Sequence, residues 1–113
     1  MNNDILRIIR YTFNFGDDKM IELFNSGGLE VTRTQVCAWL KKDDDPDFKT
    51  IYDHQLASFL NAFINEKRGK KEGVQPVAEK KLNNNVIFRK LKIALNLKDD
   101  DILEILGLVN FRF

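Results

Sequence analysis

The sequence predicts an all-α protein that contains one small helical unit twice, complete in the first copy and partial in the second. Residues 2–31 align without a gap with residues 84–113, so that Asn3 aligns with Asn85. A self-match at a fixed period is the signature of an internal repeat. Apolar residues recur at helical spacing in both segments, and Gly, Pro and capping residues interrupt them. The residues that recur unchanged are Asn2, Asn3, Ile5, Arg7, Asn14, Asp17, Asp18 and Glu22.

Length and composition narrow the class of protein. The chain has 113 residues, of which 43% are hydrophobic and 31% charged, and this suits one domain or two very small ones. A formal net charge of +1 gives no overall attraction to nucleic acid or membrane. The single cysteine excludes an internal disulfide. Because no apolar run approaches the ~20 residues of a membrane span and no signal-peptide pattern begins the chain, we expect a cytoplasmic protein without membrane association.

The first copy, residues 1–67, is expected to contain four helices, and the first of them spans residues 3–14. Ile5 and Ile9 share one face of this helix at a spacing of four. Asn2 or Asn3 can cap the start of this helix, because a short amide side chain satisfies the free backbone N–H groups there.

The second predicted helix spans residues 17–26. Asp17 and Asp18 open it, since carboxylates are favoured at the positive end of the helix dipole. Gly27 and Gly28 follow its last turn and end it, because glycine adopts positive φ without steric cost.

The third predicted helix, residues 32–42, begins with a capping box of Thr32 and Gln35. The acidic stretch 43–47 contains a proline and is expected to form a surface turn. A fourth helix then spans residues 52–67. The side chains expected in the core are Phe24, Trp39, Leu40, Phe59 and Phe63.

Residues 68–82 form a basic linker that is rich in lysine and glycine. The partial second copy, residues 83–113, repeats the first two helices as residues 84–96 and 99–107. We expect the long polar linker to keep the two copies apart.

The element formed by the second and third helices has the lengths and the glycine turn of a helix-turn-helix motif. Such a motif places the start of its second helix against base edges, while lysines bind phosphates. Two arguments oppose this hypothesis: packed helix pairs occur in any helical protein, and the acidic run 43–47 would repel phosphate. The residues that the hypothesis assigns to nucleic acid are Arg33, Thr34, Gln35, Lys41, Lys42, Lys70 and Lys71.

The sequence does not indicate an enzyme or a cofactor. His54 is the only histidine, and Cys37 lies on an apolar helix and is expected to be a small buried residue. The run 43–47 lacks the glycine and the later glutamate of a calcium-binding loop. The first functional hypothesis is therefore a DNA-binding regulator. The alternative is a protein-interaction or scaffold module, because tandem helical units form grooves and near-neutral charge suits a protein partner.

Four segments together resemble the YehS-like family of small bacterial proteins, which consist of two tandem copies of a domain of unknown function. These segments are the repeated NND/NNN opening, ELFNSGGLEVT with VCAWLKKDDDPDF, FLNAFINEKRGK, and NNNVIFRKLKIALNLKDDDILEIL. The resemblance spans essentially the whole chain. It implies a cytoplasmic, all-helical protein with no established activity. The family has no known catalytic or ligand-binding residues that could be assigned to positions of this sequence. Members usually complete the second copy with two further helices, whereas this sequence ends at Phe113.

We expect the apolar stripes of the partial copy to be covered in one of two ways. The copy either folds back on the first copy or pairs with the same segment of a second chain in a two-fold interface. We favour the second arrangement, because the linker is long and polar. The residues assigned to this self-association are Ile102, Ile105, Leu106, Phe111 and Phe113.

Size-exclusion chromatography with light scattering tests this prediction. The expected result is a dimer that Leu106→Asp dissociates, because a carboxylate in an apolar interface is not solvated. A monomer across a wide concentration range excludes self-association. On the fold-back arrangement, Leu106→Asp destabilises the monomer instead.

Overall fold

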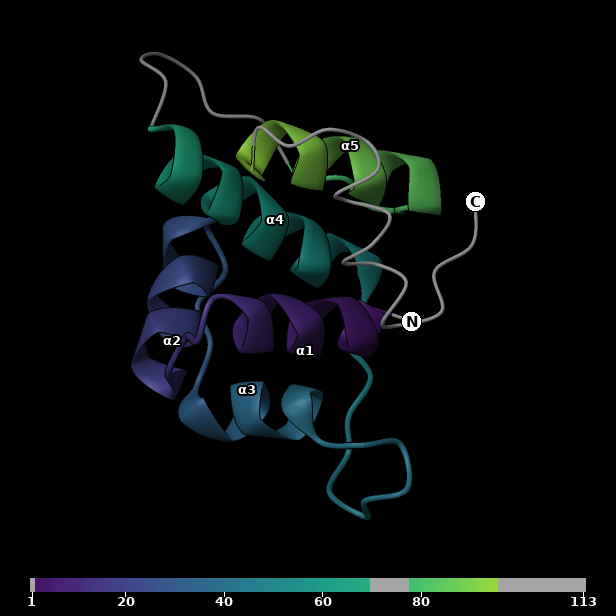
Figure 1. The fold of residues 1–113 in the computed structure, drawn as a ribbon. Helices are drawn as coiled ribbons and strands as arrows, with labels where there is room; N and C mark the ends of the chain where they lie inside the picture. The colour runs from purple at the N-terminus through teal and green to yellow at the C-terminus, as the bar shows by residue number, and fades with distance from the viewer. Residues whose placement is uncertain (1, 70–77, 96–113) are drawn as a thin grey trace.

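The computed structural model describes residues 2–69 and 78–95. These residues form helices and connecting segments without a strand, which confirms the predicted all-α class for this part of the chain. Figure 1 shows α4 and α5 lying next to each other, α1 beside α4, and α3 on the far side of α1. α2 lies across one end of this arrangement and packs against α4 and α3. The helices are α1 (Asn2–Thr12), α2 (Asp17–Ser26), α3 (Arg33–Leu40), α4 (Asp53–Arg68) and α5 (Asn84–Leu95).

Each predicted helix that falls in the described ranges is present, with ends close to those expected. The helix expected at 99–107 lies outside these ranges. α1 stops before 14 because Asn14 has a positive φ of 53°, and the Phe15 N–H donates back to the Arg10 carbonyl at 3.0 Å. α3 ends at Leu40, before the extended residue Lys41.

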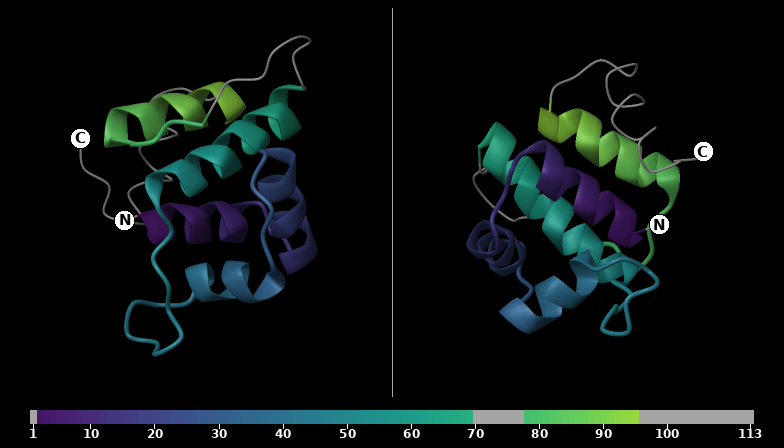
Figure 2. Two further views of the ribbon diagram at one scale, coloured as in Figure 1. Left: turned by 180° about the vertical axis from the view of Figure 1, so that it is seen from behind. Right: turned by 60° about the horizontal axis from the view of Figure 1, so that its bottom comes forward.

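The core is one apolar cluster to which all five helices contribute. Both α1 and α5 pack against α4, as the two views in Figure 2 also show. Four of the five expected core side chains, Phe24, Trp39, Phe59 and Phe63, are buried. The expectation for Leu40 was too strong: it is only partly buried, because it is the last residue of α3 and lies at the edge of the cluster.

The capping box at the start of α3 is confirmed. The Gln35 N–H donates to Thr32 Oγ1 at 3.2 Å, and the Thr32 N–H donates to Gln35 Oε1 at 2.8 Å. The two glycines after α2 are required for different structural reasons. Gly28 has a φ of 92°, which agrees with the expected helix end. Gly27 has an ordinary φ, but a Cβ there would lie 2.1 Å from the Ser58 carbonyl oxygen, so glycine allows α2 to approach α4.

Asn2 and Asn3 were the two candidate caps of α1, but both lie within the helix, and Asn3 has a different role. It is the second residue of α1 and is only 4% exposed. Asn3 Nδ2 donates to the carbonyl oxygens of Trp39 and Lys49 at 2.8 Å each, and Asn3 Oδ1 accepts from the Ile51 N–H at 3.2 Å. One amide therefore connects α1 to the chain on both sides of the turn that follows α3.

Asp53, the first residue of α4, connects three parts of the chain. Asp53 Oδ1 accepts from Asn2 Nδ2 at 2.7 Å, and Asp53 Oδ2 accepts from the Leu82 N–H at 2.9 Å. These hydrogen bonds, that from Asn2 first, lower the pKa of Asp53, because they stabilise the ionised carboxylate. The carboxylate thus connects the start of α1 and the segment before α5 to the start of α4.

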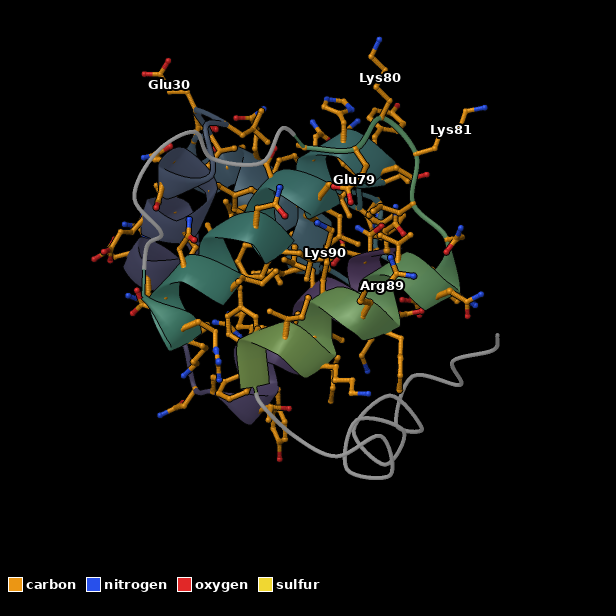
Figure 3. The ribbon with its side chains drawn as sticks, turned by 90° about the horizontal axis from the view of Figure 1, so that it is seen from above. Glu30, Glu79, Lys80, Lys81, Arg89 and Lys90 are labelled. Carbon is orange, nitrogen blue, oxygen red and sulfur yellow. The ribbon has the colours of Figure 1, made fainter. Side chains whose placement is uncertain are left out.

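The expectation that the linker keeps the copies apart is wrong for α5. Ile87, Leu91 and Ala94 are buried in the common core, and α5 packs along α4. Lys90 Nζ donates to Asn61 Oδ1 on α4 at 2.6 Å and lies 3.0 Å from Glu79 Oε2. Figure 3 shows Lys90 and Glu79 pointing toward one another. The first helix of the second copy therefore folds back on the first copy.

We predict that Asn3→Ala lowers the free energy of unfolding by about 3 kcal/mol, because the substitution leaves buried carbonyl and N–H groups without partners. Urea denaturation measures the change. Asn85→Ala is the matched control, since Asn85 is the exposed counterpart of Asn3 in α5. The control should change stability by less than about 0.5 kcal/mol, and an equal loss in both variants would contradict the assignment.

Asp53 predicts a pH-dependent contribution to stability. Its folded-state pKa is lowered, so the stabilisation is fully present above the unfolded-state pKa of about 3.9 and is lost as pH falls through the folded-state value. Wild type should exceed Asp53→Asn in free energy of unfolding at neutral pH, and the difference should shrink in acid below about pH 4. Asp44→Asn, in the exposed turn, removes the same charge and is the control. A difference that stays constant down to acid pH would disprove the prediction.

Candidate functional site

The predicted helix-turn-helix element is formed by α2, the glycine turn and α3. The two helices pack through Phe24 and Trp39, whose ring centroids lie 5.1 Å apart. The third helix is short, and the capping box fixes where it begins. The acidic turn that leads to α4 lies along the outer side of α3.

The start of α3 carries the three residues expected to read bases, and two of them already have partners. The Arg33 guanidinium pairs with Asp18 and lies 3.4 Å from Asp17 Oδ2. The hydrogen bond to Asp18 is the main cause that raises the pKa of Arg33. Gln35 takes part in the capping box, and Thr34 is exposed. The positive charge at this helix start therefore lies next to two carboxylates.

Two of the four lysines assigned to phosphate, Lys41 and Lys42, lie in the described residues. Lys41 is half-buried, and its backbone carbonyl accepts from Arg7 Nη1 at 2.7 Å. Lys42 is exposed at the start of the acidic turn. Lys70 and Lys71 lie outside the described residues, as do the residues assigned to self-association: Ile102, Ile105, Leu106, Phe111 and Phe113.

A groove of about 720 Å³ runs between the outer side of α3 and the turn before α4. It brings together Arg33, Thr34, Gln35 and Lys41 of the predicted set. The sequence analysis missed its other lining residues. One of them, Ala38, could have been found, because it shares a helix face with Thr34 and Lys41 at the spacing i, i+4, i+7. The residues that line the groove are Arg33, Thr34, Gln35, Cys37, Ala38, Lys41, Pro46, Asp47 and Lys49.

Cys37 was expected to be buried, and this is wrong. It is partly exposed and lines the groove, and its Sγ lies 3.9 Å from Asp17 Oδ2. The apolar period of α3 predicts an inward side chain only where a neighbouring helix covers that side. Val36 and Trp39 lie on the covered side of α3, and Cys37 lies on the side that faces the groove.

A smaller hollow of about 240 Å³ lies beside the groove, and it shares Gln35 and Lys49 with it. Tyr52, which is 63% exposed, lines this hollow. Its backbone N–H donates to Gln55 Oε1 at 2.9 Å at the start of α4. The groove and the hollow are therefore neighbours that meet at Gln35 and Lys49.

The chemistry of this surface suits binding. Lys41, Lys49 and Arg33 supply positive charge and Asp47 one carboxylate, while Ala38 and Pro46 supply apolar contact. His54 is exposed near the start of α4 and does not line the groove. Among the residues with assigned positions, no group of three or more metal-ligating side chains is found. Within the same ranges, no helix has the length and apolar character needed to cross a membrane.

Comparison with known proteins bears out the family resemblance. A family model described as a protein of unknown function, DUF1456, matches residues 2–69 and 84–113, which contain the two segments that the sequence aligns with each other. The chain is 42% identical over 113 residues to the uncharacterized protein YehS of Escherichia coli (strain K12), and the match covers 99% of this chain and 72% of that relative. No solved structure matches. The chain belongs to the DUF1456 family.

Proposed function

We propose that the protein is a non-enzymatic interaction module that binds an acidic, partly apolar peptide segment of a partner protein in the groove along α3. The groove supports this proposal because it combines exposed apolar surface with lysines on opposite walls. Ala38 and Pro46 would contact apolar side chains, and Lys41 and Lys49 would pair with carboxylates.

The single observation that carries the proposal is the position of the turn before α4. This turn forms the second wall of the groove, so that α3 has a concave surface beside it and is not a freely projecting helix. Backbone hydrogen bonds from Asp45 to Lys42 and from Phe48 to Asp45 hold the turn in shape. A preformed groove favours peptide binding, because little conformational entropy is lost when the partner enters.

A DNA-binding regulator is the second candidate, and the α2–turn–α3 arrangement favours it. The electrostatics weigh more strongly against DNA than against a peptide. Arg33 is paired with Asp17 and Asp18, and the exposed carboxylates of the turn beside α3 repel a continuous phosphate backbone. A peptide needs only a few carboxylates, which can be placed at Lys41 and Lys49. Under this candidate, random-sequence duplex DNA would bind at low salt and dissociate as salt rises. Arg33→Glu and Lys70→Glu would each weaken that binding. Under the peptide proposal, duplex DNA does not bind micromolar protein.

The peptide proposal predicts the outcome of a selection of short random peptides displayed on phage against the full-length chain. The selected sequences should combine Asp or Glu with apolar residues. For one synthesised peptide, Lys49→Glu should weaken binding about tenfold, because charge attraction becomes repulsion. Lys81→Glu, an exposed lysine outside the groove, makes the same change of charge and should bind as the wild type does. Equal affinity in both variants, or selected peptides without acidic residues, contradicts the proposal.

A further inference from the structure

The hollow beside the groove is lined by two glutamines that are fixed in the same way. Gln35 and Gln55 are each the third residue of a helix, α3 and α4. Gln35 Oε1 accepts from the Thr32 N–H at 2.8 Å. Gln55 Oε1 accepts from the Tyr52 N–H at 2.9 Å. Because a backbone N–H requires an acceptor, the oxygen of each side-chain amide faces the helix start and the nitrogen does not.

The amide nitrogens of both glutamines remain available at the hollow. Gln35 and Gln55 line it, and within residues 2–69 and 78–95 neither Nε2 donates a hydrogen bond. Gln35 also lines the groove, whereas Gln55 lines only the hollow. The local rule that starts two helices therefore leaves two donors at one hollow, and each donor is held in place by the oxygen of its own amide.

Two further donors line the hollow. Trp39 is only 4% exposed, and its indole N–H has no acceptor among the described residues. Buried indole N–H groups usually have a partner. Lys49 supplies a positive charge, and in the same part of the chain its ammonium group has no carboxylate partner. No carboxylate is found among the described residues that line the hollow, which are Gln35, Trp39, Lys49, Thr50, Tyr52 and Gln55.

This set of donors favours a carboxylate as the ligand. An ionised carboxylate accepts several hydrogen bonds and donates none, so it is not opposed by the N–H groups around it. The hollow has a volume of about 240 Å³, below the roughly 300 Å³ at which small-molecule pockets begin, so it suits a single side chain. The rings of Trp39 and Tyr52 provide apolar contact for the methylene groups that precede the carboxylate.

We propose that the hollow is a subsite for a glutamate side chain of the peptide that lies in the groove. The subsite rests on the proposed function, because the groove and the hollow meet at Gln35 and Lys49 and a side chain of the bound peptide passes between them. The two glutamine amides and the indole of Trp39 donate to the carboxylate, and Lys49 pairs with it. Glutamate fits better than aspartate, since its extra methylene carries the carboxylate past the junction toward Gln55.

Gln55→Glu tests the subsite without removing the start of α4. A capping box accepts Glu as well as Gln at the third helical position, so the Tyr52 N–H keeps its acceptor while the free donor becomes a carboxylate oxygen. The probe is a glutamate-containing peptide synthesised after the phage selection, and isothermal titration calorimetry with the whole chain measures its affinity. Gln55→Glu should weaken binding about tenfold, because a hydrogen bond is replaced by repulsion.

Asn83→Asp is the matched control. It makes the same change from amide to carboxylate at the start of α5, where Asn83 Oδ1 accepts from the Val86 N–H at 2.9 Å and aspartate is an equally good cap. Asn83 does not line the hollow, so this variant should bind the peptide as the wild type does.

Replacing each glutamate of the peptide by glutamine in turn locates the side chain that enters the hollow. At one position the replacement should weaken binding about tenfold. There, the effect combined with Gln55→Glu should be smaller than the product of the two separate effects, because the two groups are in contact. Trp39 is the single tryptophan of the chain and lines the hollow, so its fluorescence emission should change when the original peptide saturates the protein.

The outcomes separate the subsite from the proposed function. If no peptide binds, both are overturned. If Lys49→Glu weakens binding but Gln55→Glu and Asn83→Asp bind as the wild type does, the groove is supported and the subsite is overturned. Equal losses in Gln55→Glu and Asn83→Asp also overturn the subsite, since the cause is then overall charge. Independent effects at every glutamate of the peptide overturn it as well, because no glutamate then contacts Gln55.

Discussion

The buried hydrogen bonds of Asn3 are the interaction on which the first helical unit depends. The turn between α3 and α4 is polar and acidic, so its composition gives it little apolar surface to bury. Asn3 holds both ends of that turn by bonding the backbone at Trp39, Lys49 and Ile51. Because buried backbone groups must be paired, the amide fixes where α3 ends and where the chain enters α4. The shape of the groove along α3 follows from this geometry.

α4 is the second element on which the fold depends, since it packs against α1, α2 and α5. Its buried residues include small ones, Ala57, Ser58 and Ala62, beside large ones such as Phe59. The small residues let neighbouring backbones come close, as at Gly27, and the phenylalanines fill the remaining space. Asp53 at its start connects Asn2 with Leu82, so the same helix also aligns the segment that leads to α5.

One residue pattern that recurs in the sequence has two outcomes in the structure. Asn3 and Asn85 stand at matching positions of matching helices, yet one is buried and the other exposed. The difference arises from what packs on the outer face of each helix, not from the helix itself. A helix of this size does not bury its side chains alone, and the elements packed against it decide which of them are covered. Within the described residues, α4 packs against both α1 and α5, while Asn85 and Arg89 of α5 are exposed.

The sequence by itself determined the all-α fold class, the positions of the helices, the capping box of α3 and the end of α2. These features depend on the local spacing of apolar residues and on side chains that are neighbours in the sequence. The capping box of Thr32 and Gln35 and the glycine at 28 are examples. The roles of Asn3, Cys37 and Leu40 were decided by tertiary structure. Whether an amide caps a helix or bonds a distant loop, and whether an apolar side chain is covered, depends on partners far away in sequence. The fold-back of α5 belongs to the same group, because linker composition says how far a chain can reach but not which surface it meets.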